Sequence, residues 1–426
     1  MDLFNKKMQM QIDNLTLEKE LGRGQFGSVY LTKLDNDNTP YATKVYDRQT
    51  IEKSEDLLRY IKTEATILKN LNHPNIVKLK EVKKTKKHYY IVMEFCNGGE
   101  LSQNLKKYQA KYNKAFPEEI VQYLMKQIVN GINYLHNLDI MHRDIKLDNI
   151  LLHYDNEEDK KNLNIMKSKV KIIDFGFAIF LKNRLGQTAV GSPLNMDPRI
   201  VEKLSNRGRL KKLLYDKKAD IWSLGSICYE MLIGRAIFDA EDLDELVDLI
   251  EKGDYKVPSG LSREVVSFLN GMLQYDPTIR LSSFDLVNHR FLTENINNFH
   301  KINLSLSLNV KHAKNQTIWD IFNPDDAKKL NNISPAQIEQ NNNNNPMIQS
   351  KNSATSSKAM NEQPIKSYNT YDNANYPNMN NINFINQGDN PNYGAKLPTR
   401  DNNPLYVNQK FDNEINYTFS GGIFDV

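Results

Sequence analysis

Cysteine and long apolar runs are scarce in this sequence of 426 residues. Its two cysteines, Cys96 and Cys228, share no spacing typical of a metal site and are too few for a disulfide framework, so we expect a reducing, cytoplasmic setting. No run of about 18 consecutive apolar residues occurs, which predicts no membrane span. The amino-terminal stretch MDLFNKKMQM lacks a long apolar segment, so a secretory signal is not expected either.

A strong charge of one sign is also missing. Lysine and arginine total 56, aspartate and glutamate total 52, and the formal net charge is +4. This excess is too small to indicate a nucleic acid or an anionic membrane as a partner, and none is expected. No internal repeat is visible, and the length suffices for more than one domain with a substantial core.

Amino-acid composition changes near residue 293, where asparagine becomes dominant, as in NNNNNP and NANYPNMNNINFINQ. Such a segment buries too little apolar surface to offset its ordering entropy, so residues 293–426 are predicted to be a mostly disordered tail. Its apolar islands, TIWDIF (317–322) and the terminal GGIFDV, are either docking motifs for regulatory partners or merely local clusters.

The part before the tail divides into two regions. Residues 15–92 are strand-rich, interrupted by one predicted helix at 57–71 in which Leu57, Ile61, Thr63, Ile67, Leu68 and Leu71 approximate a 3.6-residue period. Residues 98–292 are mainly helical, with wide apolar faces in EEIVQYLMKQIVNGINYLH and KADIWSLGSICYEMLIG. The predicted fold class is therefore α+β, with a small β-rich N-lobe and a larger helical C-lobe. A hinge at 93–97 joins them, residues 1–14 form an extension, and ligands are expected between the lobes.

The stretch LGRGQFGSVYLTK contains a G-x-G-x-x-G pattern at Gly22, Gly24 and Gly27. This pattern occurs at strand-to-helix turns of dinucleotide-binding folds, in strand hairpins that cover nucleotide phosphates, and in plain hairpins. After the third glycine, SVYLTK alternates apolar and polar residues, which predicts a strand and not a helix. We therefore expect a hairpin, with Lys44 of YATKV on the next strand in reach of phosphate oxygens.

Two further motifs, MHRDIKLDNILL and KIIDFGFA, carry the polar groups that phosphoryl transfer to a hydroxyl requires. Asp144 suits the acceptance of the hydroxyl proton, and Lys146 lies close enough along the loop to contact a γ-phosphate. Asn149 and Asp174 offer hard oxygen ligands for Mg²⁺. Taken alone, each of these residues could be an ordinary turn residue. Their order and spacing together indicate one site.

With these motifs the chain resembles a eukaryotic serine/threonine protein kinase over residues 15–292, and DIWSLG (220–225) and DPTIR (276–280) extend the likeness. The resemblance implies ATP and Mg²⁺ as cofactors, Glu64 as the partner of Lys44, and Asp220 as a brace beneath the catalytic loop. Met93 would line the back of the adenine pocket. The full set of implied nucleotide contacts is Leu21, Gly22, Gly24, Gly27, Val29, Ala42, Lys44, Met93, Glu94 and Cys96.

The resemblance also indicates the substrate class. Lys146 in DIKLDN is similar to the serine/threonine form, in which Ser192 of the GSP motif would contact Asp144 and Lys146. Protein substrates with Ser or Thr hydroxyls are therefore expected. The alternatives are a pseudokinase scaffold and a small-molecule kinase. The side chains at the five catalytic positions are all competent, which weighs against a pseudokinase; these positions are Lys44, Glu64, Asp144, Asn149 and Asp174. The GSPLNMDPR segment resembles that of kinases with peptide substrates, which weighs against a small-molecule kinase.

Finer features are similar to ULK-type kinases, which initiate autophagy: a DFGFA start of the activation segment and Thr188 three residues before GSP. Thr188 is the candidate activating phosphosite, with Arg143 as the partner of its phosphate. The tail weakens this subfamily assignment, because it lacks the helical periodicity of the C-terminal domain usual in ULK-type kinases.

One departure from the family pattern is prominent. Most kinases have Ala-Pro-Glu after the activation segment, and the Glu pairs with a buried Arg; here the stretch is Asp197, Pro198 and Arg199, although the partner Arg280 is present. A buried guanidinium without a carboxylate would be costly. The hypothesis is that Glu202 or Asp197 takes over the pairing.

Overall fold

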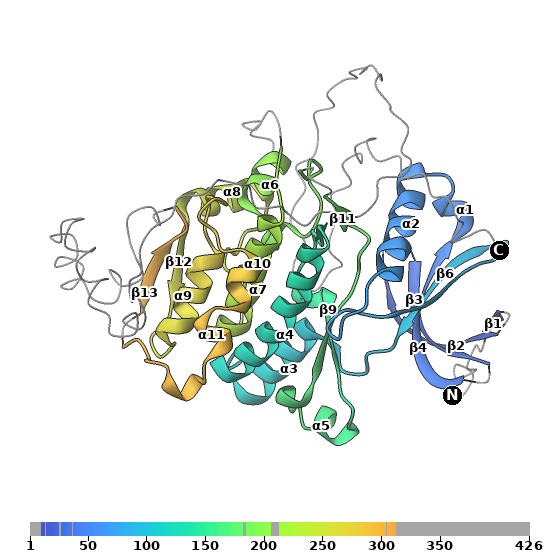
Figure 1. The fold of residues 1–426 in the computed structure, drawn as a ribbon, viewed down its shortest axis with the longest axis horizontal. Coiled ribbons are helices and arrows are strands. Elements are labelled where there is room, and N and C mark those ends of the chain that lie inside the picture. Colours follow the sequence, from blue (N-terminus) through green and yellow to red (C-terminus); the bar gives the residue numbers. More distant parts are fainter. Residues whose placement is uncertain are drawn as a thin grey trace, which may run out of the picture. The chain divides into compact units, whose positions relative to one another are not determined.

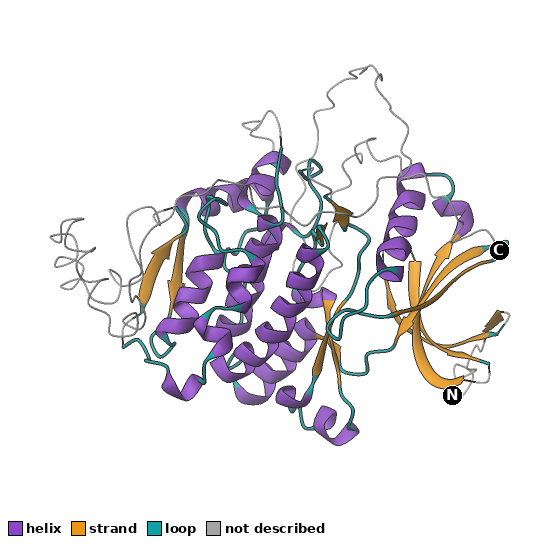
Figure 2. Ribbon diagram, viewed as in Figure 1, coloured by secondary structure: helices purple, strands orange, loops and turns teal. Residues whose placement is uncertain are grey.

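The computed structural model describes residues 10–12, 14–24, 27–35, 37–181, 185–205, 213–303 and 305–311. The predicted tail beyond 311, with its TIWDIF and GGIFDV motifs, lies outside the described residues. Strands are concentrated toward the amino terminus and helices fill most of the remainder (Figure 2). The predicted two-lobed α+β architecture is confirmed.

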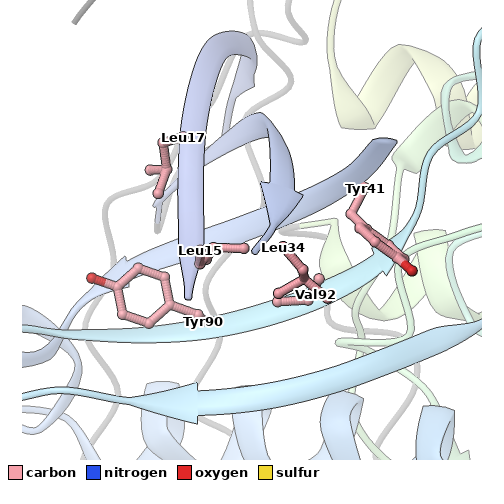
Figure 3. Packing of buried hydrophobic residues seen from close by; sticks show 6 residues of the cluster. All are labelled: Leu15, Leu17, Leu34, Tyr41, Tyr90 and Val92. Atoms are coloured by element: carbon pink, nitrogen blue, oxygen red, sulfur yellow. The ribbon is translucent and has the colours of Figure 1, made fainter. Parts of the chain in front are cut away.

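The N-lobe is built on an antiparallel sheet with the strand order β1-β2-β3-β4-β6-β5. Its strands are β1 (Met10–Ile12), β2 (Leu15–Arg23), β3 (Gly27–Leu34), β4 (Asp37–Asp47), β5 (Leu79–Lys84) and β6 (His88–Glu94). The glycine motif spans the end of β2, which contains Gly22, and the start of β3 at Gly27; the strand after the third glycine is the one that the alternating pattern predicts. One face of the sheet buries an apolar cluster shown in Figure 3: Leu15, Leu17, Leu34, Tyr41, Tyr90 and Val92.

Two helices, α1 (Arg48–Ile51) and α2 (Glu55–Lys69), follow β4 (Figure 1). The helix predicted at 57–71 is thus confirmed with an earlier start, because the Ser54 side chain caps it by accepting from the Leu57 amide. Ile61, Ile67 and Leu68 of the predicted apolar face are buried. Two polar residues on that buried face, Tyr60 and Glu64, belong to the site described below.

The C-lobe is mainly helical, and both long helices expected from the sequence are present. The α-helices are α3 (Leu101–Tyr112), α4 (Glu118–Asn137), α5 (Glu157–Lys161), α6 (Pro198–Leu204), α7 (Lys218–Ile233), α8 (Leu243–Lys252), α9 (Arg263–Met272), α10 (Ser283–Val287) and α11 (Arg290–Thr293). Nearly every residue of α7 is buried, as expected for a helix that is apolar on all sides. Among the described residues, no helix has the length and apolar character needed to cross a membrane.

Short strands position the segments that carry the polar motifs. They are β7 (Gly99–Glu100), β8 (Ile140–Met141), β9 (Ile150–His153), β10 (Lys169–Ile172) and β11 (Ile179–Phe180), with the 3-10 turns η1 (Leu147–Asn149), η2 (Ile165–Lys167) and η3 (Pro193–Asn195). β9 pairs with β10, and β8 pairs with β11. Asp144 therefore lies between β8 and β9, and Asp174 is the second residue after the end of β10. The charged segment between β9 and β10 contains α5.

The chain stays ordered beyond residue 292, so the predicted disorder does not hold for the first part of the tail. After η4 (Ile296–Asn298), β13 (Leu306–Asn309) pairs with β12 (Asp254–Val257). The reason is visible in the sequence INLSLSLNV, whose alternate apolar residues are those of a strand. Leu308 and Val310 are buried on the C-lobe. Lys301 adds an ion pair of 2.5 Å with Glu118 at the start of α4.

We expect a chain ended at residue 292 to be less stable than one ended at residue 311. The shorter chain loses the β12–β13 pairing and exposes the apolar surface that residues 299–310 cover, which should lower the melting temperature by at least about 5 °C. Thermal unfolding of both truncated chains by circular dichroism measures the difference. Equal melting temperatures would show that the ordered extension contributes nothing.

Candidate active site

Lys44 lies at the centre of β4 and joins two carboxylates from distant parts of the chain. Its Nζ donates to Glu64 Oε1 of α2 at 2.5 Å and to Asp174 Oδ1 at 3.2 Å. Burial opposes the charge of Lys44, but Asp174 and Glu64 more than offset this and hold its pKa well above the usual value. The lysine is therefore a permanent cation, and the pairing with Glu64 expected from the sequence is present.

Asp144 is held by the residues around it in the catalytic loop. Asn149 Nδ2 donates to the backbone oxygen and to Oδ2 of Asp144, both at 2.8 Å. Ser192 Oγ donates to Asp144 Oδ1 at 2.8 Å and accepts from Lys146 Nζ at 2.9 Å. Gly191 makes this approach possible: its φ of 117° is in the left-handed region, and a Cβ there would lie 2.5 Å from the Arg143 carbonyl oxygen. The contacts expected for Ser192 are thus present.

The catalytic loop and the segment after β10 are in direct contact. The Ile173 amide donates to the Asn149 carbonyl at 3.0 Å, and the Ile173 carbonyl lies 3.0 Å from His142 Nε2. The His142 ring also packs edge-on against Phe175, with 5.1 Å between centroids. Asp174 is therefore tied to the loop that carries Asp144 and Asn149. These contacts and the Lys44–Asp174 hydrogen bond bring the four predicted residues together in one region: Lys44, Asp144, Asn149 and Asp174.

Asp220 supports the catalytic loop from α7. Its Oδ1 accepts from the Arg143 amide, and its Oδ2 from the His142 amide and His136 Nε2, each at 2.9 Å. Burial would raise the pKa of Asp220, but these hydrogen bonds and the nearby histidines outweigh it, and the pKa lies below its usual value. Arg143 has a φ of 69°, a strained conformation for a residue with a side chain. The brace expected at Asp220 fixes that strained turn.

Two hinge residues, Met93 and Cys96, have buried side chains. Met93 on β6 is buried and pairs with Ala42 of β4. Cys96 is buried as well, and burial raises the pKa of its thiol to about 12. The Glu94 carboxylate is engaged elsewhere, because Oε1 accepts from Lys171 Nζ at 2.7 Å and from the Lys78 amide at 2.8 Å. The Glu94 amide is engaged as well, because it donates to the Lys78 carbonyl at 3.0 Å.

These residues fit ATP and Mg²⁺. An added Cβ at Gly22 would meet nothing within 4 Å, so the hairpin backbone can approach a phosphate without hindrance from its own neighbours. Asn149 and Asp174 supply hard oxygen atoms. No group of three or more His, Cys, Asp or Glu side chains gathers as a metal cage in the described ranges. A Mg²⁺ ion here would take its other ligands from phosphates and water, as this ion commonly does.

Asp197 resolves the departure at the end of the activation segment. Its Oδ2 accepts from Arg280 Nη1 at 2.6 Å, and both side chains are 0% exposed. Arg199 adds a second contact, at 3.1 Å from Nε to Oδ1. Of the two hypothesised partners, Asp197 is the one that pairs with Arg280, because it caps α6 and accepts from the Arg199 amide at 3.0 Å, which turns the carboxylate inward. Glu202 lies further along α6, where its backbone carbonyl accepts a hydrogen bond from the Ser205 hydroxyl at 2.8 Å.

Hydrogen bonds hold the activation segment in place near Thr188. Arg143 Nη1 donates to Thr188 Oγ1 at 2.7 Å, so the predicted phosphosite lies beside the predicted arginine. Tyr215 donates from its hydroxyl to the Thr188 carbonyl at 2.5 Å, and its backbone pairs with Gly186 through two hydrogen bonds of 2.7 and 3.1 Å. Tyr215 was not among the site residues expected from the sequence, where it follows a lysine- and arginine-rich stretch; residues 206–212 of that stretch lie outside the described residues.

Two tyrosines near Lys44 were also missed. Tyr46 donates to Glu64 Oε2 at 3.0 Å, and Tyr60 donates to Asp174 Oδ1 at 3.2 Å. A signal for both existed in the sequence. Tyr46 is two residues after Lys44 on one strand, and Tyr60 is four residues before Glu64 on one helix, so each shares a face with a predicted site residue.

The geometry brings three chemical functions to one place: a cation for phosphate oxygens, hard ligands for Mg²⁺, and a carboxylate next to a hydroxyl. Phosphoryl transfer from a nucleoside triphosphate needs all three, and this defines an ATP-dependent phosphotransferase site. Comparison with known families specifies it further. The sequence model of the protein kinase domain matches residues 15–292, and the chain belongs to this family.

Curated relatives agree with that membership. Serine/threonine-protein kinase atg1 of Dictyostelium discoideum is 34% identical over 296 residues, which cover 68% of this chain and 41% of that protein. Myosin light chain kinase A of the same organism is 34% identical over 286 residues, which cover 66% of this chain and 88% of that protein. Calcium-dependent protein kinase 5 of Plasmodium falciparum is 33% identical over 68% of this chain and 47% of its own length. The chain thus spans about half or less of two of these three relatives.

Asp197→Asn should destabilise the fold strongly. The variant leaves the buried Arg280 guanidinium without its carboxylate, a change that typically costs about 3 to 5 kcal/mol. Chemical denaturation of the full chain measures this loss, with Glu202→Gln as the matched control that should unfold like the wild type. If Asp197→Asn unfolds at the same denaturant concentration as the wild type, the Asp197–Arg280 pair does not stabilise the fold.

The same pair predicts a direction for acid sensitivity. Burial would raise the pKa of Asp197, but Arg280 and Arg199 hold it below the ordinary value of 3.8. The contribution of the pair to stability is therefore present above about pH 4 and is lost as pH falls through the lowered folded-state pKa.

Proposed function

We propose that this protein is a serine/threonine protein kinase that transfers the γ-phosphate of MgATP to Ser or Thr hydroxyls of protein substrates. The observation that carries the proposal is the joined pair of clusters, Lys44 with Glu64 and Asp174, and Asp144 with Lys146 and Ser192. The kinase family membership and relatives whose names designate serine/threonine kinases support it.

The roles of the residues follow from their chemistry. Asp144, fixed by Asn149 and Ser192, accepts the proton of the attacking hydroxyl, and Lys146 beside it balances the charge near the transferred phosphate. Lys44 holds phosphate oxygens, while Glu64 keeps the lysine in place. Asn149 and Asp174 would hold Mg²⁺, which when bound screens the charge on the phosphates.

An active enzyme is favoured over a pseudokinase scaffold. A scaffold needs neither the contact between Lys44 and Asp174 nor the carboxylate of Asp144, yet both are assembled here. Ser192 Oγ bridges Asp144 and Lys146, and this link between the activation segment and the proton acceptor supports a protein hydroxyl as the acceptor. Regulatory partners that bind through the tail, and a cytoplasmic location consistent with two buried free thiols, complete the proposal.

The proposal extends to the subfamily. The DFGFA start of the activation segment and the likeness to the kinase atg1 relative support a ULK-type kinase with a place in autophagy. The myosin light chain kinase A relative, at the same identity, is the competing indication. A peptide-array profile of acceptor sequences, compared with those of ULK-type and myosin light chain kinases, would discriminate between them.

Asp144→Asn is expected to abolish phosphate transfer while leaving the fold intact. Removing the proton acceptor should lower turnover by at least about a hundredfold. Incubation with γ-labelled ATP and a generic protein substrate, followed by phosphoamino-acid analysis, measures both the rate and the residue modified. A pseudokinase would give no label in the wild type, and a small-molecule kinase would label no protein.

Thr188→Ala should lower activity severalfold. A phosphate on Thr188 would bring nearly two negative charges against Arg143 and order the activation segment. The test compares the variant with wild-type enzyme in its phosphorylated and phosphatase-treated forms. Equal turnover of the two wild-type forms would remove Thr188 from the mechanism.

A further inference from the structure

The two oxygens of the Asp174 carboxylate have different surroundings. Oδ1 accepts three donors: Lys44 Nζ at 3.2 Å, the Tyr60 hydroxyl at 3.2 Å and the Gly176 amide at 3.4 Å. Within the described part of the chain, no hydrogen bond to Oδ2 is present, and the side chain is 23% exposed. One oxygen is thus fastened by the protein while the other is left for a ligand.

Tyr60 is itself held in place. Its ring lies so close over Gly176 that a Cβ there would come within 1.8 Å of Tyr60 Cζ. The ring also meets Phe177 edge to face, with 5.5 Å between centroids. Since Tyr60 is 9% exposed, the phenol has little room to turn away from Asp174. The glycine of the DFG motif is therefore required here by the tyrosine ring.

Asp174 needs an external constraint. Its backbone φ is 65°, in the left-handed region that residues with side chains seldom adopt. Lys44 alone does not fix the carboxylate, since its Nζ also binds Glu64. A second donor from a different element defines the orientation of the carboxylate plane.

We propose that Tyr60 is a positioning residue for the metal site: its hydroxyl pins Asp174 Oδ1 so that Oδ2 is presented to Mg²⁺. The inference rests on the proposed function. Helix α2 would then position two site residues: Lys44 through Glu64, and Asp174 through Tyr60. The phenol is a neutral donor, so it orients the carboxylate without adding to the local charge.

Tyr60→Phe in the full chain tests the proposal, since it keeps the ring on Gly176 and removes only the hydroxyl. Losing one hydrogen bond to a charged group should raise the Mg²⁺ concentration for half-maximal effect about five- to tenfold. The first readout is the rise in melting temperature with a non-hydrolysable ATP analogue across a Mg²⁺ titration, which needs no turnover. The second is the Mg²⁺ dependence of phosphate transfer.

Tyr89→Phe is the matched control, because the Tyr89 hydroxyl belongs to the same lobe and donates at 2.6 Å to Glu52 Oε1, which is not a group of the site. Its Mg²⁺ curves should match those of the wild type. Tyr60→Leu, which lacks the ring too, should shift the curves at least as far as Tyr60→Phe.

Wild-type Mg²⁺ curves for Tyr60→Phe would overturn the proposal, as would a shift seen only in Tyr60→Leu, which would assign the effect to packing. A lower melting temperature without any change in Mg²⁺ dependence would also reduce Tyr60 to a structural role. Failure of the kinase proposal is distinguishable, because it would appear as Mg²⁺-dependent nucleotide binding by the wild type without phosphate transfer.

Discussion

The contact between Lys44 and Asp174 is the constraint on which the rest of the site depends. It joins a strand of the N-lobe to the end of a strand in the C-lobe, across 130 positions of sequence. One cation between two carboxylates in a buried setting is stable only when each group is well satisfied by hydrogen bonds. Glu64 meets this condition through Lys44 and the Tyr46 hydroxyl.

Buried carboxylates organise the C-lobe in a similar way. Asp220 accepts hydrogen bonds from the backbone amides of the strained turn at Arg143. Asp197 forms an ion pair with the Arg280 guanidinium and also caps α6. Both have lowered pKa values, so they remain charged acceptors over a wide pH range. The catalytic loop and the end of the activation segment are therefore fixed by helices α6 and α7 and by Arg280.

Much of the fold and the core of the site could be predicted, because motifs with a chemical purpose keep their residues at fixed positions. Lys44, Asp144, Asn149 and Asp174 were found in this way. The choice of Asp197 over Glu202 could not be, since it depends on the direction of a helix cap in space. Tyr60 was missed because one tyrosine on a helix face is ordinarily core. The ordering of residues 293–311 was missed because an asparagine-rich composition outweighed a short alternating pattern.

The buried thiols have a chemical consequence for the domain. Burial raises the pKa of Cys96 to about 12 and that of Cys228 above its usual value, so almost no thiolate exists at neutral pH. Thiolate is the form that peroxides and alkylating agents attack. Cys96 belongs to the predicted base-binding segment, yet electrophiles aimed at its thiol would react slowly. Oxidative signals that modify exposed, acidic thiols in other enzymes should leave this kinase domain unaltered.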